Sequence, residues 1–223
     1  MKLPRIKSCD RVQFILDRID GKSVLHLGCA DWPFTQAKLE NETLLHQKMA
    51  TMAKKLVGVD LEPHAIEIMQ QAGINDLTLG NSEASLFELL NEKFDVVVAG
   101  EIIEHVLNPG LFLDSIKTVC HEHSQVIITT VNFSPIKKIP RLLWNSEPVH
   151  PDHVYYFSFS TLSCLLVKCG YQVEEWSTYW WDVGAISKVL NLFLRKIPIL
   201  QYYADGFCLV CHTGSKGNFN QRC

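Results

Sequence analysis

The stretch from Ser23 to Asp60 constrains the fold of this 223-residue chain more than any other. Two short apolar runs, residues 23–27 and residues 56–59, have the length and composition of buried strands. A tight turn at Gly28 follows the first run, Asp60 follows the second, and a helix is expected between them. Strand, glycine turn, helix and strand form a βαβ unit, which predicts a sheet of parallel strands.

The helix of this unit is expected to begin at Asp31-Trp32-Pro33 and to run to about Lys54. Asp31 can cap the free amides of a helix start, and Pro33 suits a first turn because it has no N–H to leave unpaired. A helix start beside a glycine turn offers N–H groups, and Asp60 can accept hydrogen bonds from two ribose hydroxyls. The unit therefore predicts a site for a ligand that contains a nucleoside.

Three segments in this order resemble the class I S-adenosylmethionine-dependent methyltransferases: residues 24–30, 57–60 and 94–105. The similarity is to the branch of small-molecule O-methyltransferases that includes the ubiquinone-biosynthesis enzymes, and it covers about residues 23–176. It implies an α/β fold with a doubly wound, seven-stranded, mostly parallel Rossmann-like sheet whose last strand is antiparallel. S-adenosyl-L-methionine is the cofactor that the resemblance implies.

The glycine turn departs from two patterns. The resembling family usually has an acid where His26 stands and glycines where Ala30 and Trp32 stand. The dinucleotide fingerprint is not met either, because the turn keeps only its first glycine, Gly28. This difference argues against a nicotinamide-dependent dehydrogenase.

The rest of the chain alternates strands with helices, as a doubly wound sheet requires. Further strands are expected at residues 76–79, 95–99, 125–130, 171–177 and 206–212, and helices at 9–19, 63–72, 109–119, 160–169 and 186–197. Length and a hydrophobic content of 47% fit one methyltransferase domain over residues 1–223. Two segments, about 132–157 and 178–205, are expected to form a lid and the acceptor pocket.

The resemblance implies that the cofactor-binding residues follow the predicted strands. Asp60 is expected to bind the ribose, Asn81 to accept from the adenine amino group, and Glu101 to balance the ammonium and sulfonium charges. An ordinary turn is the alternative for Asn81. The full predicted set is His26, Gly28, Cys29, Ala30, Asp60, Leu61, Asn81, Ser82, Glu83, Gly100 and Glu101.

Three histidines are candidates for a general base, because histidine accepts a proton near neutral pH. His153 is the first choice and His150 the second, since residues 148–158 resemble a family segment in which a histidine precedes an aromatic-serine pair. His105 is the reserve, because it follows the fourth strand. The alternatives are histidines that only pack the loop, and a carboxylate such as Glu104 in place of a histidine.

Other patterns exclude whole classes of site. The net charge of −3 gives no general attraction to nucleic acid. His121 and His123 lack a second ligand cluster, so no metal site is expected and a solvated turn is favoured there. Cys208-Leu209-Val210-Cys211-His212 matches a haem-attachment pattern, but it lies in a predicted buried strand, and we reject it.

Scattered cysteines, with neither a signal peptide nor a membrane-spanning run, favour a cytoplasmic protein.

Residues 186–197 form an amphipathic stripe with two interpretations. Packing of its apolar side on the domain is favoured. The alternative is peripheral contact with a membrane surface by a basic amphipathic helix.

These features together predict methyl transfer from S-adenosylmethionine to a small-molecule acceptor, with a hydroxyl oxygen of a glycan intermediate or a phenol favoured. A cofactor-binding domain without catalysis, serving assembly or regulation, is the alternative. A nucleic-acid or protein methyltransferase is disfavoured, because Gly100-Glu101-Ile102 stands where an Asn-Pro-Pro-aromatic motif would be expected. The oligomeric state stays open.

Overall fold

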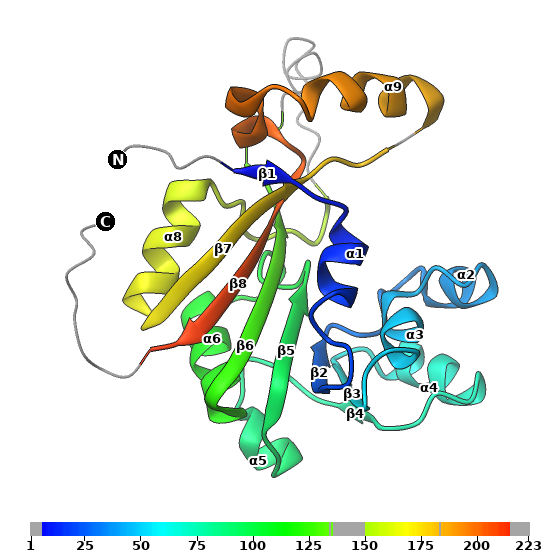
Figure 1. Cartoon of the computed structure of the whole chain (residues 1–223). Coiled ribbons are helices and arrows are strands. Elements are labelled where there is room, and N and C mark those ends of the chain that lie inside the picture. The colour runs from blue at the N-terminus through cyan, green and yellow to red at the C-terminus, as the bar shows by residue number, and fades with distance from the viewer. Residues whose placement is uncertain (1–5, 134, 136–149, 183, 215–223) are drawn as a thin grey trace.

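The computed structural model describes residues 6–133, 135, 150–182 and 184–214. Within these residues the chain forms one eight-stranded sheet with the order β1-β7-β8-β6-β5-β2-β3-β4 (Figure 1). The strands are β1 (Lys7–Ser8), β2 (Ser23–Leu27), β3 (Lys55–Asp60), β4 (Leu77–Leu79), β5 (Phe94–Gly100), β6 (Cys120–Val131), β7 (Tyr171–Tyr179) and β8 (Gly206–Thr213).

The predicted fold class is confirmed, with one strand more than expected. β8 runs antiparallel to both β6 and β7, as predicted, and every other pairing is parallel. The additional strand is β1, which pairs with β7 at the edge of the sheet. The carboxyl ends of β2, β3, β4 and β5 therefore meet along one edge.

Helices cover both faces of the sheet (Figure 1). In β5, Val97 packs into the core that contains the helices α5, α6 and α8, whereas Val96 and Val98 pack into the core that contains α1 and α3. Alternate residues of a strand point to opposite faces, so one apolar run serves both cores. The helices are α1 (Arg11–Leu16), α2 (Thr35–Glu40), α3 (Leu45–Ala50), α4 (Pro63–Gln71), α5 (Leu86–Leu90), α6 (Pro109–Thr118), α8 (Phe159–Lys168), α9 (Gly184–Leu194) and the 3-10 helix η2 (Pro198–Tyr203).

The prediction of a single helix from Asp31 to about Lys54 is wrong. The chain forms α2 and α3 instead, and Asp31 caps neither, because the residues at their N-cap positions are Phe34 and Leu44. The break between the two helices places Leu44 in the small core beneath α4 and Met49 in the core beneath α1. One straight helix would not reach both cores.

Two smaller expectations also need correction. The helix expected at residues 160–169 is α8, which begins at Phe159, because Ser158 and Thr161 form a capping box there. His121 and His123 lie at the beginning of β6 and not in a solvated turn. The reason is that β6 extends back to Cys120, which pairs with Phe94 of β5.

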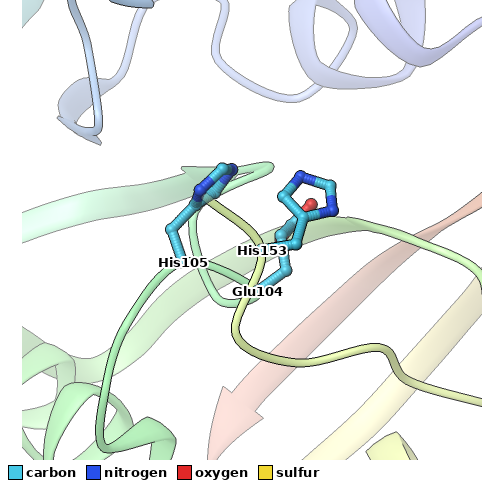
Figure 2. Close-up of side chains that lie close together, drawn as sticks. All are labelled: Glu104, His105 and His153. Carbon is cyan, nitrogen blue, oxygen red and sulfur yellow. The ribbon is translucent and has the colours of Figure 1, made fainter. Parts of the chain in front are cut away.

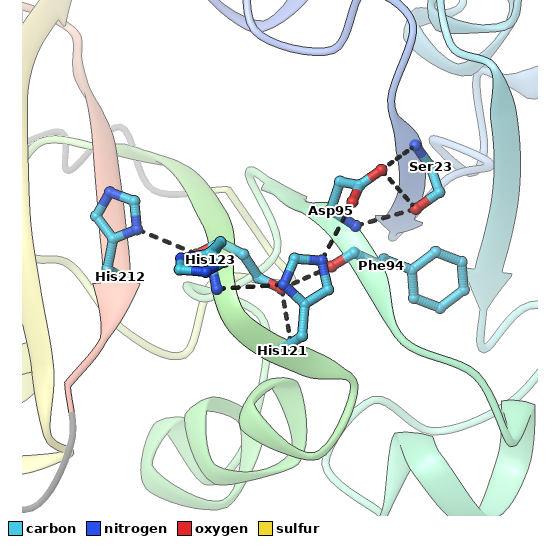
Figure 3. A network of polar contacts seen from close by, with 7 residues as sticks. Ser23, Phe94, Asp95, His121, His123 and His212 are labelled. Carbon is cyan, nitrogen blue, oxygen red and sulfur yellow. Dashed lines mark hydrogen bonds and ion pairs between the residues drawn. The ribbon is translucent and has the colours of Figure 1, made fainter.

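A polar network joins three strands at the edge opposite the glycine turn (Figure 3). The Asp95 carboxylate accepts the backbone N–H and the hydroxyl of Ser23, at 2.8 and 3.0 Å, and its other oxygen lies 3.1 Å from His121 Nε2. The backbone N–H of Ser23 is the main cause that lowers the pKa of Asp95, and the other contacts of the network add to it. The network explains Asp95 and His121 as structural residues that join β2, β5 and β6.

A buried histidine pair lies directly beneath the glycine turn. The rings of His26 in β2 and His46 in α3 are stacked, and their Nδ1 atoms lie 3.2 Å apart. Both side chains are almost completely buried. Burial lowers the pKa of His46 to about 4 and, together with the neighbouring His46 and Arg11, lowers the pKa of His26. The pair is therefore neutral in the folded protein, and it joins α3 to the sheet through one hydrogen bond between the rings.

This pair should make the protein sensitive to acid. Below the usual histidine pKa of 6.5, the unfolded chain takes up a proton on His46 that the folded chain accepts only near pH 4. The free energy of unfolding should fall over this interval, with a contribution from His46 on the order of 3 kcal/mol. Denaturant titrations at several pH values measure the free energy of unfolding. As the pH falls, this free energy should decrease less in His46→Gln than in the wild type, and it should decrease as in the wild type in the exposed control His123→Gln. An unchanged decline in His46→Gln would contradict the assignment.

Candidate active site

A cavity of about 300 Å³ opens where the carboxyl ends of β2, β3, β4 and β5 meet. Ligands of doubly wound sheets bind at this edge. Of the eleven residues predicted to bind the cofactor, ten line the cavity: His26, Gly28, Cys29, Asp60, Leu61, Asn81, Ser82, Glu83, Gly100 and Glu101. Ala30 does not, because its side chain is buried behind the turn. The structure thus brings the predicted residues together from four separate strand ends.

The Asp60 side chain holds the turn after β2 and the turn after β3 in place. One carboxylate oxygen accepts the backbone N–H of Ala30 at 2.8 Å, and the other accepts the N–H of Glu62 at 3.1 Å. Each oxygen keeps a second lone pair for another donor. Ala30 therefore contributes to the site through its backbone.

The glycine turn approaches its neighbours closely. Gly28 has φ +68°, and a Cβ added there would lie 3.2 Å from the Ile102 side chain. Only glycine adopts this conformation in so little space without strain. Trp32, which stands where the resembling family has glycine, lies at the rim with 47% of its surface exposed and its ring edge against His64. The indole therefore does not fill the cavity.

Arg11 of α1 is a cavity residue that the sequence analysis missed. Its Nη2 lies 3.4 Å from Glu101 Oε2, and its Nε donates to Thr129 Oγ1 at 3.0 Å. Tyr179 donates its hydroxyl to Glu101 Oε1 at 2.5 Å. The Glu101 carboxylate therefore does not face the cavity as a lone charge but as half of an ion pair. An arginine in a short N-terminal amphipathic helix carries no local signal for this role.

The polar side chains of the turn after β4 form hydrogen bonds within the turn and with the residues just before α6. Asn81 Oδ1 accepts the backbone N–H of Glu83 at 2.9 Å. The Glu83 carboxylate in turn accepts the backbone N–H groups of Leu107 and Asn108, at 3.0 and 2.7 Å. These bonds fix the turn against the start of α6. A ligand can still reach the second lone pair of the Asn81 carbonyl oxygen.

The three candidate histidines converge although they come from two distant segments. The ring centroid of His153 lies 4.6 Å from that of His105 and 4.9 Å from that of His150, and His105 and His150 both line the cavity. Backbone hydrogen bonds from Val154 and Tyr155 to the carbonyl of Glu104 hold the two segments together. Figure 2 shows the rings of His105 and His153 beside each other, with the Glu104 side chain next to them.

Hydrogen bonds distinguish the tautomers of these histidines. His105 Nδ1 lies 3.0 Å from the carbonyl oxygen of Asp152, so this nitrogen carries the proton and Nε2 is the acceptor. His150 Nδ1 instead accepts the N–H of Asp152, at 3.3 Å. His153 Nδ1 lies 3.1 Å from the Tyr156 hydroxyl. Burial lowers the pKa of His105, which keeps its ring neutral at pH 7.

Glu104 is a fully buried carboxyl beneath these rings. It accepts from the Thr130 hydroxyl at 2.9 Å and from the N–H of Val131 at 3.3 Å. Burial, and then the charge of Glu101, raises its pKa to about 7. Its carboxylate and one nitrogen each of His105 and His153 lie within 4.8 Å of one another. One carboxylate and two imidazoles can hold a proton in common or bind a divalent transition metal, a ligand set that the sequence analysis did not anticipate.

Comparisons with known proteins agree with this geometry. A family model for a methyltransferase domain matches residues 5–175. A ubiquinone biosynthesis O-methyltransferase of Glaesserella parasuis is 27% identical over 133 residues, which are 55% of this chain and 52% of that protein. The chain thus spans about half the length of this curated relative.

Solved methyltransferase structures share the fold over most of the chain. A SAM-dependent methyltransferase from Archaeoglobus fulgidus superposes with a TM-score of 0.59, at 15% identity, over 91% of each chain. Magnesium protoporphyrin IX methyltransferase from Synechocystis PCC 6803, solved with bound SAH, gives 0.59 at 10% identity over 91% of this chain and 82% of that one. The predicted resemblance to class I S-adenosylmethionine-dependent methyltransferases is confirmed, and the chain belongs to the methyltransferase domain family.

Proposed function

We propose that this chain transfers a methyl group from S-adenosylmethionine to a hydroxyl oxygen of a small molecule. The observation that carries the proposal is the convergence, at one cavity, of a carboxylate at the end of β3, an arginine–glutamate pair, and His105 and His150, with the ring of His153 against both. The curated relative is an O-methyltransferase of a small molecule, which supports the same reaction class.

The residues of the cavity fit this cofactor. Asp60 offers lone pairs to a ribose diol, and Leu61 beside it offers an exposed apolar side chain to a flat base. Arg11 and Glu101 present opposite charges to the carboxylate and ammonium groups of the methionine part. Glycine suits positions 28 and 100, since Cβ atoms added at Gly28 and Gly100 would be crowded at 3.2 Å from Ile102 and 3.1 Å from Arg11.

The bound cofactor would supply an electrophilic methyl group beside a sulfonium. The chain has to hold the acceptor oxygen in line, exclude water and receive the hydroxyl proton. His105 suits the last task best, because its Nε2 is the acceptor of a neutral ring that lines the cavity. His153 and His150 stay candidates, and Glu104 can take the proton onward.

The two segments about 132–157 and 178–205 remain our proposal for the lid and the acceptor pocket, within a single domain of residues 1–223. Asn132 joins them, because its amide donates to the carbonyls of Tyr202 and Ala204 at 2.8 and 2.9 Å. Trp181 and Tyr155 are exposed, whereas Trp180 is buried. Trp144, which belongs to the first of these segments, lies outside the described residues.

We also propose a cytoplasmic location, supported by the buried thiols of Cys29, Cys120, Cys208 and Cys211. The alternative function is a domain that binds the cofactor without catalysis. Incubation with methyl-labelled S-adenosylmethionine and an extract of small molecules should label an acceptor whose methyl group is stable to mild base, as in an ether. Cofactor binding by calorimetry without any labelled product would favour the binding domain.

Replacement of Asp60 should weaken cofactor binding. Hydrogen bonds to a charged group contribute roughly 1.5–3 kcal/mol each, so Asp60→Asn should raise the Kd for S-adenosylhomocysteine about tenfold or more. Asp60→Ala should in addition lower the melting temperature, because the amides of Ala30 and Glu62 lose their acceptor. Calorimetry gives the affinity, and Asp95→Asn at the opposite edge is the matched control. Equal affinity in Asp60→Asn and the wild type would refute the assignment.

Replacement of the base should slow methyl transfer to an alkyl hydroxyl by about 10²–10⁴, and to a phenol by much less. Single-turnover rates at saturating cofactor should fall most for His105→Ala, with His153→Ala and His150→Ala tested in parallel and His123→Ala as the control. The wild-type rate should rise with pH only below 6.5, since burial lowers the pKa of His105, and stay flat above it.

Wild-type rates of methyl transfer in His105→Ala, His153→Ala and His150→Ala would exclude all three histidines as the base. Loss of activity in a chelator, restored by a transition metal, would instead assign Glu104, His105 and His153 to metal binding.

A further inference from the structure

Helix α9 is attached to the domain by its polar side. Asn191 is completely buried, and its amide donates to the carbonyl of Trp181 at 3.0 Å and to Asp182 Oδ1 at 2.5 Å. Arg195 Nη2, just beyond the helix, donates to the carbonyl of Trp180 at 3.1 Å and pairs with Asp182 at 3.2 Å. A surface helix of a globular protein normally buries its apolar side, so this orientation is reversed.

The apolar side of α9 faces outward, which corrects the favoured expectation that it packs on the domain. Exposure reaches 66% for Phe193 and 70% for Ile199 of η2. Both elements lie at the same end of the molecule, beyond the carboxyl ends of the central strands (Figure 1). We call the following exposed residues the α9–η2 surface: Val189, Leu190, Leu192, Phe193, Ile197, Ile199 and Tyr203. Apolar side chains gathered in this way indicate an interaction site.

The same segment is exclusively basic. Residues 184–203 contain Lys188, Arg195 and Lys196 and neither aspartate nor glutamate. Arg195 and Lys196 also line a cavity of about 540 Å³ together with Lys7, beside the α9–η2 surface and apart from the cofactor cavity. Apolar residues edged by cations match a layer of acyl chains beneath anionic headgroups.

Buried polar contacts hold this surface in place. Gln201, at the centre of η2, is almost fully buried and donates to the carbonyls of Leu194, Arg195 and Ile197. Its Oε1 accepts from Thr178 of β7 at 3.0 Å. The outward orientation is therefore specified by hydrogen bonds from buried side-chain amides to backbone carbonyls, and by the bond between Gln201 and Thr178.

A second copy of the chain matches the surface less well. In a symmetric contact the same patch meets itself, so Lys188 and Lys196 of both copies would lie at one apolar interface. The segment has no carboxylate to pair with them. Among the described residues, moreover, no helix is long and apolar enough to cross a bilayer.

We infer that the α9–η2 surface binds the surface of an anionic phospholipid bilayer, with its apolar side chains among the acyl chains and its lysines at the headgroups. This contact is independent of the proposed methyl transfer and needs no cofactor. It would place the edge of the sheet that carries the cofactor cavity toward the lipid.

Vesicle flotation with the full chain tests this inference. The wild type should bind vesicles that contain phosphatidylglycerol, bind pure phosphatidylcholine about tenfold more weakly, and lose the difference in high salt. Leu190→Ser/Phe193→Ser should weaken binding to both kinds of vesicle about tenfold or more. Lys188→Gln/Lys196→Gln should weaken binding only to the anionic vesicles.

The matched control is Phe87→Ser/Leu89→Ser, which removes two exposed apolar side chains of α5 and should leave binding unchanged. All the substituted residues are exposed, so circular dichroism melts should be similar. Failure of the wild type to bind anionic vesicles, or equal loss in the α5 control, would overturn the inference. A dimer in light scattering that Leu190→Ser/Phe193→Ser converts to a monomer would overturn it in favour of a second copy.

Discussion

The geometry of the cavity depends on the two hydrogen bonds that the Asp60 carboxylate accepts. This carboxylate accepts one backbone amide from the turn after β2 and one from the turn after β3, so a single side chain sets the spacing of two loops that are distant in sequence. A parallel sheet brings strand ends together, but it does not by itself fix the loops that leave them. The charge of Asp60 does so, and the backbone of Ala30 belongs to the site for that reason.

A connected set of ionisable groups lies partly in the wall of the cavity and partly behind it. Arg11, Glu101 and Tyr179 form one connected group, and Glu104 lies near it, beneath His105 and His153. Burial, and then the charge of Glu101, raises the pKa of Glu104 to about 7. We interpret the ion pair as a charged part of the cavity for binding, and the Glu104 carboxyl, which can share a proton with His105 and His153, as a titratable part for the proposed chemistry.

The α9–η2 surface has the opposite arrangement, with polar groups inside and apolar groups outside. Asn191 and Gln201 are buried because they satisfy backbone carbonyls of the segments around them, and Phe193 and Ile199 are left in the solvent. An amphipathic pattern in the sequence shows that a helix has two sides. Which side faces the domain depends on the hydrogen bonds that the domain offers.

The sequence by itself determined seven of the eight strands in chain order, because strand periodicity is a local signal, and its resemblance to a family implied the antiparallel last strand and ten of the residues around the cavity. Only the tertiary structure decided the break between α2 and α3, which is imposed by two separate cores. It also decided the position of Arg11 and the meeting of His105 with His150 and His153. These depend on contacts between residues far apart in the chain, and local patterns carry no information about such distances.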